Sequence, residues 1–417
     1  MGCLTYKILF ALLVTLTPAI VHADMAPESA NVEGLFVEGQ DTLISLMNAV
    51  LEHDSSNWTE KDWEDNLIPK HFGAEPTFVP KSRDLYRNFL SDNPREVLPV
   101  QIEELKRINA YYNDQYQHSS SMGRFPCWTL TKKVYRRSSV GLRVSRVDKF
   151  AILEGTELSA FICRDRESGQ EFRFMFTVDP GVIEVFIQSD TIENMAAKEP
   201  LIQAVLFNVM NHLGFEPDPY RGMGHLHMSY GLFDGTAHIQ KFVHHLLNHS
   251  ELFDGIWEND HFNAKPLRKL LESKPLPPTI LRALYQQMPE KISLIALHWL
   301  HTLVFNGEAL GVDLAPEHQT VEIRGNHAFE NAHLMVAQMK ILNRAITTSR
   351  EMSETDFYID HPKKVPEQML HDYFDFVGDS VDRETARRLI LPGFRPNLRH
   401  LSLDLYPCES ALTGELR

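Results

Sequence analysis

Two β-type segments joined by a tight turn constrain the fold of this chain more than any other feature of its sequence. Residues 171–178 place an apolar side chain at every second position, which is the period of a strand with one face in a core. These side chains belong to Phe172, Phe174, Phe176 and Val178. The turn-forming residues Asp179-Pro180-Gly181 follow, and the apolar run 182–187 predicts a second strand. The two strands are expected to pair as a hairpin, so the chain should contain an antiparallel sheet.

Helices with one apolar face alternate with further strands along the rest of the chain. The strand-like segments are 149–163, 225–229 and 320–324, and the helix-like segments are about 200–213, 239–247, 278–305, 329–350 and 365–391. This interleaving, together with the hairpin-like turn, predicts an α+β fold with a mostly antiparallel sheet.

The region before residue 121 has a different pattern. Amphipathic helical spacing is found in two places, and the serine run 119–121 ends the second of them. The apolar faces are formed by Leu43, Leu46, Met47, Val50 and Leu51 in the first, and by Ile102, Leu105, Ile108 and Tyr112 in the second. We therefore predict a helical N-terminal region over residues 24–120 and a main domain over residues 121–417.

The charge of the chain excludes one class of partner. Lys plus Arg number 41 against 56 for Asp plus Glu, which gives a formal net charge of −15. Such a balance repels phosphate backbones, so we expect no nucleic-acid partner. The chain also has 20 histidines, and these either include metal ligands or fill polar structural roles.

The first 23 residues have the pattern of a secretory signal peptide. Lys7 precedes an apolar run over 8–16, and the small-residue site Val21-His22-Ala23 follows. A membrane-spanning helix would need about 20 apolar residues, and Pro18 interrupts this run. We predict cleavage after Ala23, a secreted or periplasmic location, and no membrane partner for the mature chain. The mature chain keeps Cys127, Cys163 and Cys408, so at most one disulfide can form within it.

A carboxylate lies inside the second strand of the hairpin. Both faces of the run 182–187 are apolar, so this strand should be buried, and Glu184 lies within it. A buried carboxylate without a partner costs several kcal/mol. Glu184 therefore needs a cation, which is either a metal ion or substrate group at a functional site or the Arg or Lys of a structural salt bridge.

Two histidines alternate in the strand-like segment 225–229. Side chains alternate along a strand, so His225 and His227 should lie on the same face. Neighbouring imidazoles suit a divalent metal, or one metal contact and one phosphate contact. The alternative is that both histidines are structural.

A third strand carries an acidic and a basic residue on one face. Glu322 and Arg324 are two residues apart in the strand-like segment 320–324. They either form an ordinary ion pair, or they bind a metal ion and a phosphate group, since a guanidinium grips two oxygens of one anion.

In this order, these motifs resemble those of the glutamine synthetase superfamily, which includes the glutamate–cysteine ligases and other carboxylate–amine ligases. Gly224-His225-Leu226-His227-Met228-Ser229 is similar to its histidine motif, and Glu322 with Arg324 is similar to its E-x-R motif. The run 179–185 resembles a second acidic strand, and Arg268 lies in the basic segment 263–268. Glu157 best matches the first acidic strand, with Glu154 as the alternative. The resemblance covers about residues 145–350 and implies a curved, mostly antiparallel sheet flanked by helices.

The resemblance also implies an activity. It implies an ATP- and Mg²⁺- or Mn²⁺-dependent ligase that joins a small-molecule or peptide carboxylate to an amine through an acyl phosphate. The implied metal ligands are Glu157, Glu184, His225 and Glu322. The implied catalytic residues are Arg324 and Arg268, and the implied cofactor contacts are His227, Ser229, Arg268 and Arg324. The first acidic strand has a single Glu at position 157, and Phe174-Met175-Phe176-Thr177 lacks a further acid, so one or two metal ions are expected rather than three.

Two other activities remain open at this point. The first is a secreted metal-dependent hydrolase in which His225, His227 and a carboxylate bind zinc. The second is a degenerate binding protein that keeps the fold without catalysis. An exported ligase would also need delivery to a compartment that contains ATP, such as a host cell.

Overall fold

The computed structural model describes eleven parts of the chain. The predicted signal peptide, the predicted helices near residues 43–51 and 278–305, and Arg268 lie outside them. The described residues are 68–89, 94–118, 123–133, 157–179, 181–217, 224–248, 312–315, 320–324, 326, 328–352 and 366–390.

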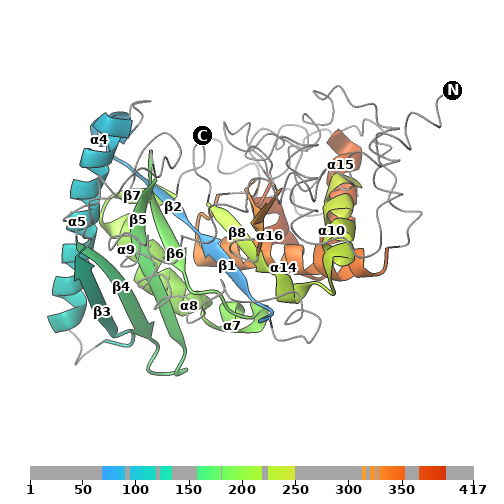
Figure 1. Cartoon of the computed structure of the whole chain (residues 1–417), viewed down its shortest axis with the longest axis horizontal. Coiled ribbons are helices and arrows are strands. Elements are labelled where there is room, and N and C mark those ends of the chain that lie inside the picture. Colours follow the sequence, from blue (N-terminus) through green and yellow to red (C-terminus); the bar gives the residue numbers. More distant parts are fainter. Residues whose placement is uncertain are drawn as a thin grey trace, which may run out of the picture.

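Six antiparallel strands form the larger sheet (Figure 1). Their order is β3-β4-β5-β6-β2-β7, with bounds Cys127–Lys133, Glu157–Arg164, Glu171–Asp179, Val182–Ile187, Thr77–Pro80 and Phe215–Pro217. The predicted hairpin is confirmed, because β5 and β6 pair antiparallel with Val178 opposite Ile183. The aromatic side chains at alternate positions of β5 are almost fully buried, which explains why this strand dominates the sequence pattern.

Four antiparallel strands form the smaller sheet. Their order is β1-β8-β10-β9, with bounds Phe72–Glu75, His225–Ser229, Thr320–Ile323 and Val312–Ala315. The predicted strands at 225–229 and 320–324 are therefore present, and they are direct neighbours.

One short stretch of chain joins the two sheets. β1 and β2 are separated only by Pro76, yet β1 pairs with β8 in the smaller sheet and β2 pairs with β6 in the larger one. Phe72 exchanges two backbone hydrogen bonds with Asp190, at 2.7 and 3.0 Å, and Pro76 O accepts one from Val185 N at 2.9 Å. Figure 1 shows β1 and β2 running between β6 and β8. Side chains from both sheets are thereby brought to neighbouring positions.

Helices cover one face of the larger sheet. Tyr112 of α5 (Pro94–His118) packs against Phe161, Phe174 and Phe176, with ring centroids 4.7–5.6 Å apart. Its hydroxyl donates a hydrogen bond to Val205 O in the helical run 199–212. The aromatic core therefore lies between the sheet and these helices. The elements on this side are α4 (Arg83–Phe89), α5, α8 (Glu199–Ile202), the π-helical turn Gln203–Phe207 and α9 (Asn208–His212).

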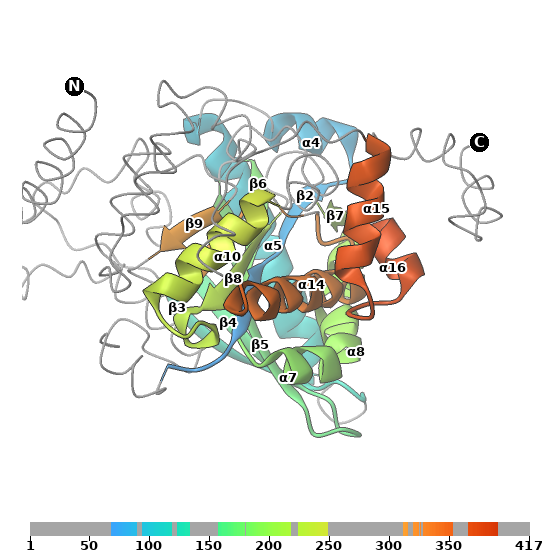
Figure 2. The same cartoon turned by 90° about the vertical axis from the view of Figure 1, so that its right-hand side faces the viewer.

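A second group of helices packs around α14. Figure 2 shows α10 on one side of α14, and α15 with α16 on the other. Asn331 caps α14 by accepting a hydrogen bond from Leu334 N at 2.8 Å. The bounds are α7 Ile192–Ala197, α10 Thr236–Asn248, α14 Ala332–Arg350, α15 Pro366–Val377 and α16 Arg383–Arg388, with a 3-10 turn at Tyr230–Leu232.

The fold is therefore α+β with antiparallel sheets, as the sequence predicts. The predicted helical region 24–120 contains strands as well as helices. Helices α4 and α5 lie within it, but residues 72–80 form β1 and β2, which pair with strands from later parts of the chain. These strands are too short, at four residues each, to give a clear alternation pattern. Within the described residues, no helix has both the length and the apolar character needed to span a bilayer.

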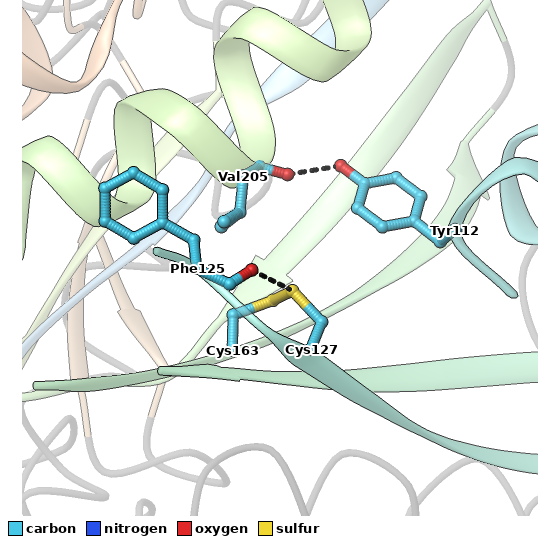
Figure 3. The surroundings of a disulfide bond; sticks show 5 residues. All are labelled: Tyr112, Phe125, Cys127, Cys163 and Val205. Carbon is cyan, nitrogen blue, oxygen red and sulfur yellow. Dashed lines mark hydrogen bonds between the residues drawn. A yellow bond between two sulfur atoms is a disulfide. The ribbon is translucent and has the colours of Figure 1, made fainter. Parts of the chain in front are cut away.

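A disulfide joins β3, an edge strand of the larger sheet, to its neighbour β4. Cys127 in β3 and Cys163 in β4 lie directly opposite each other, and both are buried. Figure 3 shows the bond beside Phe125, whose carbonyl oxygen lies 3.9 Å from Cys127 Sγ. The bond closes a sequence separation of 36 residues and holds the edge strand on the sheet.

We expect loss of this bond to destabilise the protein by about 4 kcal/mol, since the unfolded chain regains the closed loop's entropy. Cys127→Ser and Cys163→Ser should each lower the Tm by roughly 5–10 °C. The double variant should melt close to either single variant, because all three lose the same bond. Calorimetry of the four proteins tests this, and strictly additive losses in the double variant would contradict it.

Candidate metal centre

Five polar side chains meet on one face of the smaller sheet. In the antiparallel register, Glu75 of β1 lies opposite His225 of β8, and Glu322 of β10 lies opposite His227. Directly opposed residues point to the same side of a sheet. The intervening residues Ala74, Leu226, Met228, Val321 and Ile323 are buried, so the apolar side of each strand faces the core and holds the polar side in place.

Glu75 bridges the two histidines. Its Oε2 lies 3.2 Å from His225 Nδ1, and its Oε1 lies 3.2 Å from His227 Nε2. His227 Nδ1 in turn lies 3.4 Å from Thr320 Oγ1. The two imidazoles therefore present different ring nitrogens, Nδ1 and Nε2, to the same carboxylate.

Glu322 connects this group to a guanidinium. Its Oε1 lies 2.9 Å from His225 Nδ1 and 2.9 Å from Arg324 Nε. The Glu322 side chain is 7% exposed, whereas the Arg324 side chain is 29% exposed. The arrangement places the partly exposed guanidinium of Arg324 directly beside the carboxylate–imidazole group.

One subset has the spacing of a metal centre. The ligand atoms of Glu75, His225 and His227 all lie within 4.8 Å of one another. Two imidazole nitrogens and a carboxylate form a ligand set that proteins use for divalent transition metals. These residues therefore fit a divalent ion, and we treat them as a candidate metal centre.

The protonation of the cluster reflects its mutual charges. Burial alone would lower the pKa of His225, but hydrogen bonds to Glu322 and Glu75 outweigh it and raise that pKa to about 10. The pKa of His227 is also raised, because the charge of Glu75 outweighs burial. Burial would raise the pKa of Glu322, yet His225 and His227 lower it to about 2, and they also hold the pKa of Glu75 well below its usual range. Without a metal, protons on the imidazoles thus balance the two carboxylates.

Two glycines let β1 lie close against β8. Gly224 adopts φ +80°, and an added Cβ would lie 2.6 Å from the Phe329 ring and 2.7 Å from Glu75 O. At Gly231 a Cβ would lie 2.2 Å from Ile68 O. Both ends of the histidine segment therefore need a residue without a side chain, which explains the glycines that flank it in the sequence.

Ser229 anchors the chain that enters β1. Its hydroxyl donates to Pro69 O and accepts from His71 N at 3.0 Å. The sequence motif suggested a cofactor contact for Ser229, and the structure places it in these two backbone hydrogen bonds. This serine thus helps to set the register that puts Glu75 opposite His225.

The structure brings together four of the predicted site residues, namely His225, His227, Glu322 and Arg324. Glu184 is buried in β6, opposite both Thr77 and Thr177, and is not part of the group with metal-ligand spacing. Glu157 begins β4, and β5 and β6 lie between that strand and β2. Arg268 lies outside the described residues.

The sequence analysis missed Glu75, which contacts both imidazoles of the cluster. A usable signal was present, because Phe72-Gly73-Ala74-Glu75-Pro76-Thr77-Phe78-Val79-Pro80 is an apolar run with a carboxylate inside it. That is the same feature that singled out Glu184 in residues 182–187. The two prolines obscured the strand, since proline is rare within sheets.

Comparisons with known proteins add no assignment. No family model, no curated protein and no solved structure matches this chain. The role of the cluster must therefore be argued from its own geometry and chemistry.

The raised pKa of His225 predicts a pH dependence for the metal-free protein. His225 has a folded pKa of about 10 against an ordinary value of 6.5, so its contribution to stability is complete below pH 6.5 and lost as pH rises through 10. The Glu322 contribution, with a folded pKa of about 2 against 4.5, is lost as pH falls between these values.

Melting curves in EDTA from pH 3 to 10.5 measure this dependence. His225→Gln should flatten the alkaline limb relative to wild type. His371→Gln, which removes an exposed imidazole on α15, should leave it unchanged. An unchanged alkaline limb in His225→Gln would show that the imidazole carries no such proton.

Proposed function

We propose that this protein is an ATP- and divalent-metal-dependent carboxylate–amine ligase. The observation that carries the proposal is the shared carboxylate Glu322, which lies 2.9 Å from both His225 Nδ1 and Arg324 Nε. A metal centre and a guanidinium at one carboxylate suit a ligand that is both anionic and metal-bound. The phosphate groups of ATP have that chemistry.

The order of the acidic strands supports the same class. Glu75 provides an acidic strand beside the histidine strand, a place for which the sequence had offered Glu157. Glu184 lies in the next strand, because β6 pairs with β2 directly after β1. The two acidic strands, the histidine strand and the strand with Glu322 and Arg324 are then neighbours across the two sheets. This arrangement is in keeping with the resemblance to the glutamine synthetase superfamily and its curved sheet.

The reaction needs positioning and charge neutralisation from the protein. In the first step a substrate carboxylate oxygen attacks the γ-phosphorus of ATP, giving an acyl phosphate and ADP. In the second, an amine attacks the acyl carbon, phosphate leaves, and the amine proton passes to a base. Arg324 would bind the γ-phosphate and stabilise its developing charge, and a metal ion would neutralise the phosphate oxygens. The partners are a small-molecule or peptide carboxylate and an amine.

Export of the chain is part of the proposal. Disulfides persist in oxidising compartments, so the Cys127–Cys163 bond supports the secreted or periplasmic location that the first 23 residues predict. An exported ligase requires ATP at its destination, and delivery into a host cell would provide it.

A metal-dependent hydrolase is the second candidate. The observation that favours it is the ligand set itself, since two imidazoles and one carboxylate bind catalytic zinc in several hydrolases. In this reading Glu322 would act as base and no nucleotide would be needed. Hydrolysis of ester or peptide substrates by the zinc-loaded protein, without ATP, would favour this candidate over the ligase. A protein that binds metal but catalyses neither reaction would be the degenerate member of the fold.

The role of Arg324 tests the ligase proposal. Arg324→Lys keeps the positive charge but loses the planar fork, so ATP-dependent turnover should fall by about 10²–10³-fold. The assay measures ADP release with Mg²⁺ or Mn²⁺ and a panel of amino acids and short peptides. ATP binding by titration calorimetry gives a second readout. The Tm should change little, because a cation still lies beside Glu322.

The matched control is Arg350→Lys, which alters an exposed ion pair with Asp234 on a different element and should be silent. A stable Arg324→Lys protein with wild-type turnover would exclude a phosphate-binding role for Arg324. Absence of ATP binding by the wild-type protein with either metal would exclude the ligase.

A further inference from the structure

The candidate metal centre contains two imidazoles that contact different oxygens of the same carboxylate. His225 Nδ1 lies at Glu75 Oε2 and His227 Nε2 lies at Glu75 Oε1, both at 3.2 Å. The sequence resemblance assigns only His225 to the metal and gives His227 to the nucleotide. In the structure both residues lie at the same distance from Glu75.

We propose that Glu75, His225 and His227 together bind one transition-metal ion, with both imidazoles as ligands, and that the centre prefers Zn²⁺ to Mg²⁺. The inference deepens the metal centre of the proposed function, but it does not depend on ATP and holds for the hydrolase as well. It adds His227 to the ligand set and assigns the class of metal.

Distance is the first argument. Ligand atoms about 2.0–2.2 Å from a metal ion lie roughly 3.4 Å apart in a tetrahedral site. The carboxylate–imidazole separations here are 3.2 Å, and all ligand atoms of the three residues fall within 4.8 Å. The widest separation exceeds the tetrahedral value by at most about 1.4 Å, so side-chain rotations of that size would close the site around an ion.

Ligand chemistry is the second argument. Mg²⁺ prefers six oxygen ligands in a near-octahedral arrangement, and imidazole nitrogens suit Zn²⁺, Cu²⁺, Fe²⁺ or Ni²⁺. A set of two nitrogens and one carboxylate is therefore a poor magnesium site. The other carboxylate, Glu322, is held by Arg324 at 2.9 Å, which reduces the negative charge available to a hard cation.

The surroundings of His227 are the third argument. A metal-ligating histidine usually donates its other ring N–H to a fixed acceptor, which sets the tautomer. With Nε2 toward Glu75, Nδ1 of His227 faces Thr320 Oγ1 at 3.4 Å. Thr320 lies on β10, the strand that pairs with β8. It is thus a positioning residue for the His227 imidazole.

Metal affinity tests the proposal on the mature chain, residues 24–417, stripped with EDTA. Competition titrations should give Zn²⁺ affinity at least about 10³-fold above that for Mg²⁺. His225→Gln and His227→Gln should each weaken Zn²⁺ binding by at least about 100-fold, and Thr320→Val by about 10-fold. His371→Gln, an exposed imidazole on α15, should leave the affinity unchanged.

X-ray absorption of the zinc-loaded wild-type protein gives a readout that needs no variant to fold, and it should count two imidazole ligands. One imidazole, or full zinc affinity in His227→Gln beside its loss in His225→Gln, would overturn the two-histidine centre. Equal affinity for Mg²⁺ and Zn²⁺ would overturn the metal preference. Failure of the ligase is separate: a two-histidine zinc centre without ATP turnover would refute the ligase and leave this inference standing.

Discussion

The structure depends on a single stretch of chain that belongs to two sheets. Residues 72–80 pair with β8 on one side of Pro76 and with β6 and β7 on the other. Proline offers no N–H for a ladder, yet its carbonyl still accepts from Val185. The two sheets are joined because the chain changes its pairing strand at Pro76, from β8 to β6. The strands of the candidate metal centre, β1, β8 and β10, are all placed relative to that junction.

The same stretch decides the electrostatics of the centre. Glu75 and Glu322 are two largely buried carboxylates, and the imidazoles on β8 stabilise the ionised form of each. Neither carboxylate would remain ionised there without the cations opposite it. A metal ion that bound here would have to displace those imidazole protons, because an imidazole ligates a metal only in its neutral form.

The sequence identified the parts of the site that depend on local rules. Alternation along a strand placed His225 with His227 and Glu322 with Arg324, and the structure brings these four together. Glu75 could not be predicted in this way, because its contacts depend on the pairing of β1 with a strand 150 residues later. Strand pairing over such distances is decided by register and turn geometry, which Gly224, Gly231 and Ser229 enforce only once the chain has folded.

The position of β1 near the start of the chain also has a consequence for the order of assembly. Its neighbours β6 and β8 leave the ribosome or a translocon more than a hundred residues later, and β10 almost a hundred after that. Pairing over such separations is slow, since much chain must be ordered before any contact forms. Until then β6 and β8 present open edges that invite aggregation. A truncated chain that begins after β2 would keep those edges permanently, and a chain translocated unfolded would have to complete this pairing in the compartment in which it folds.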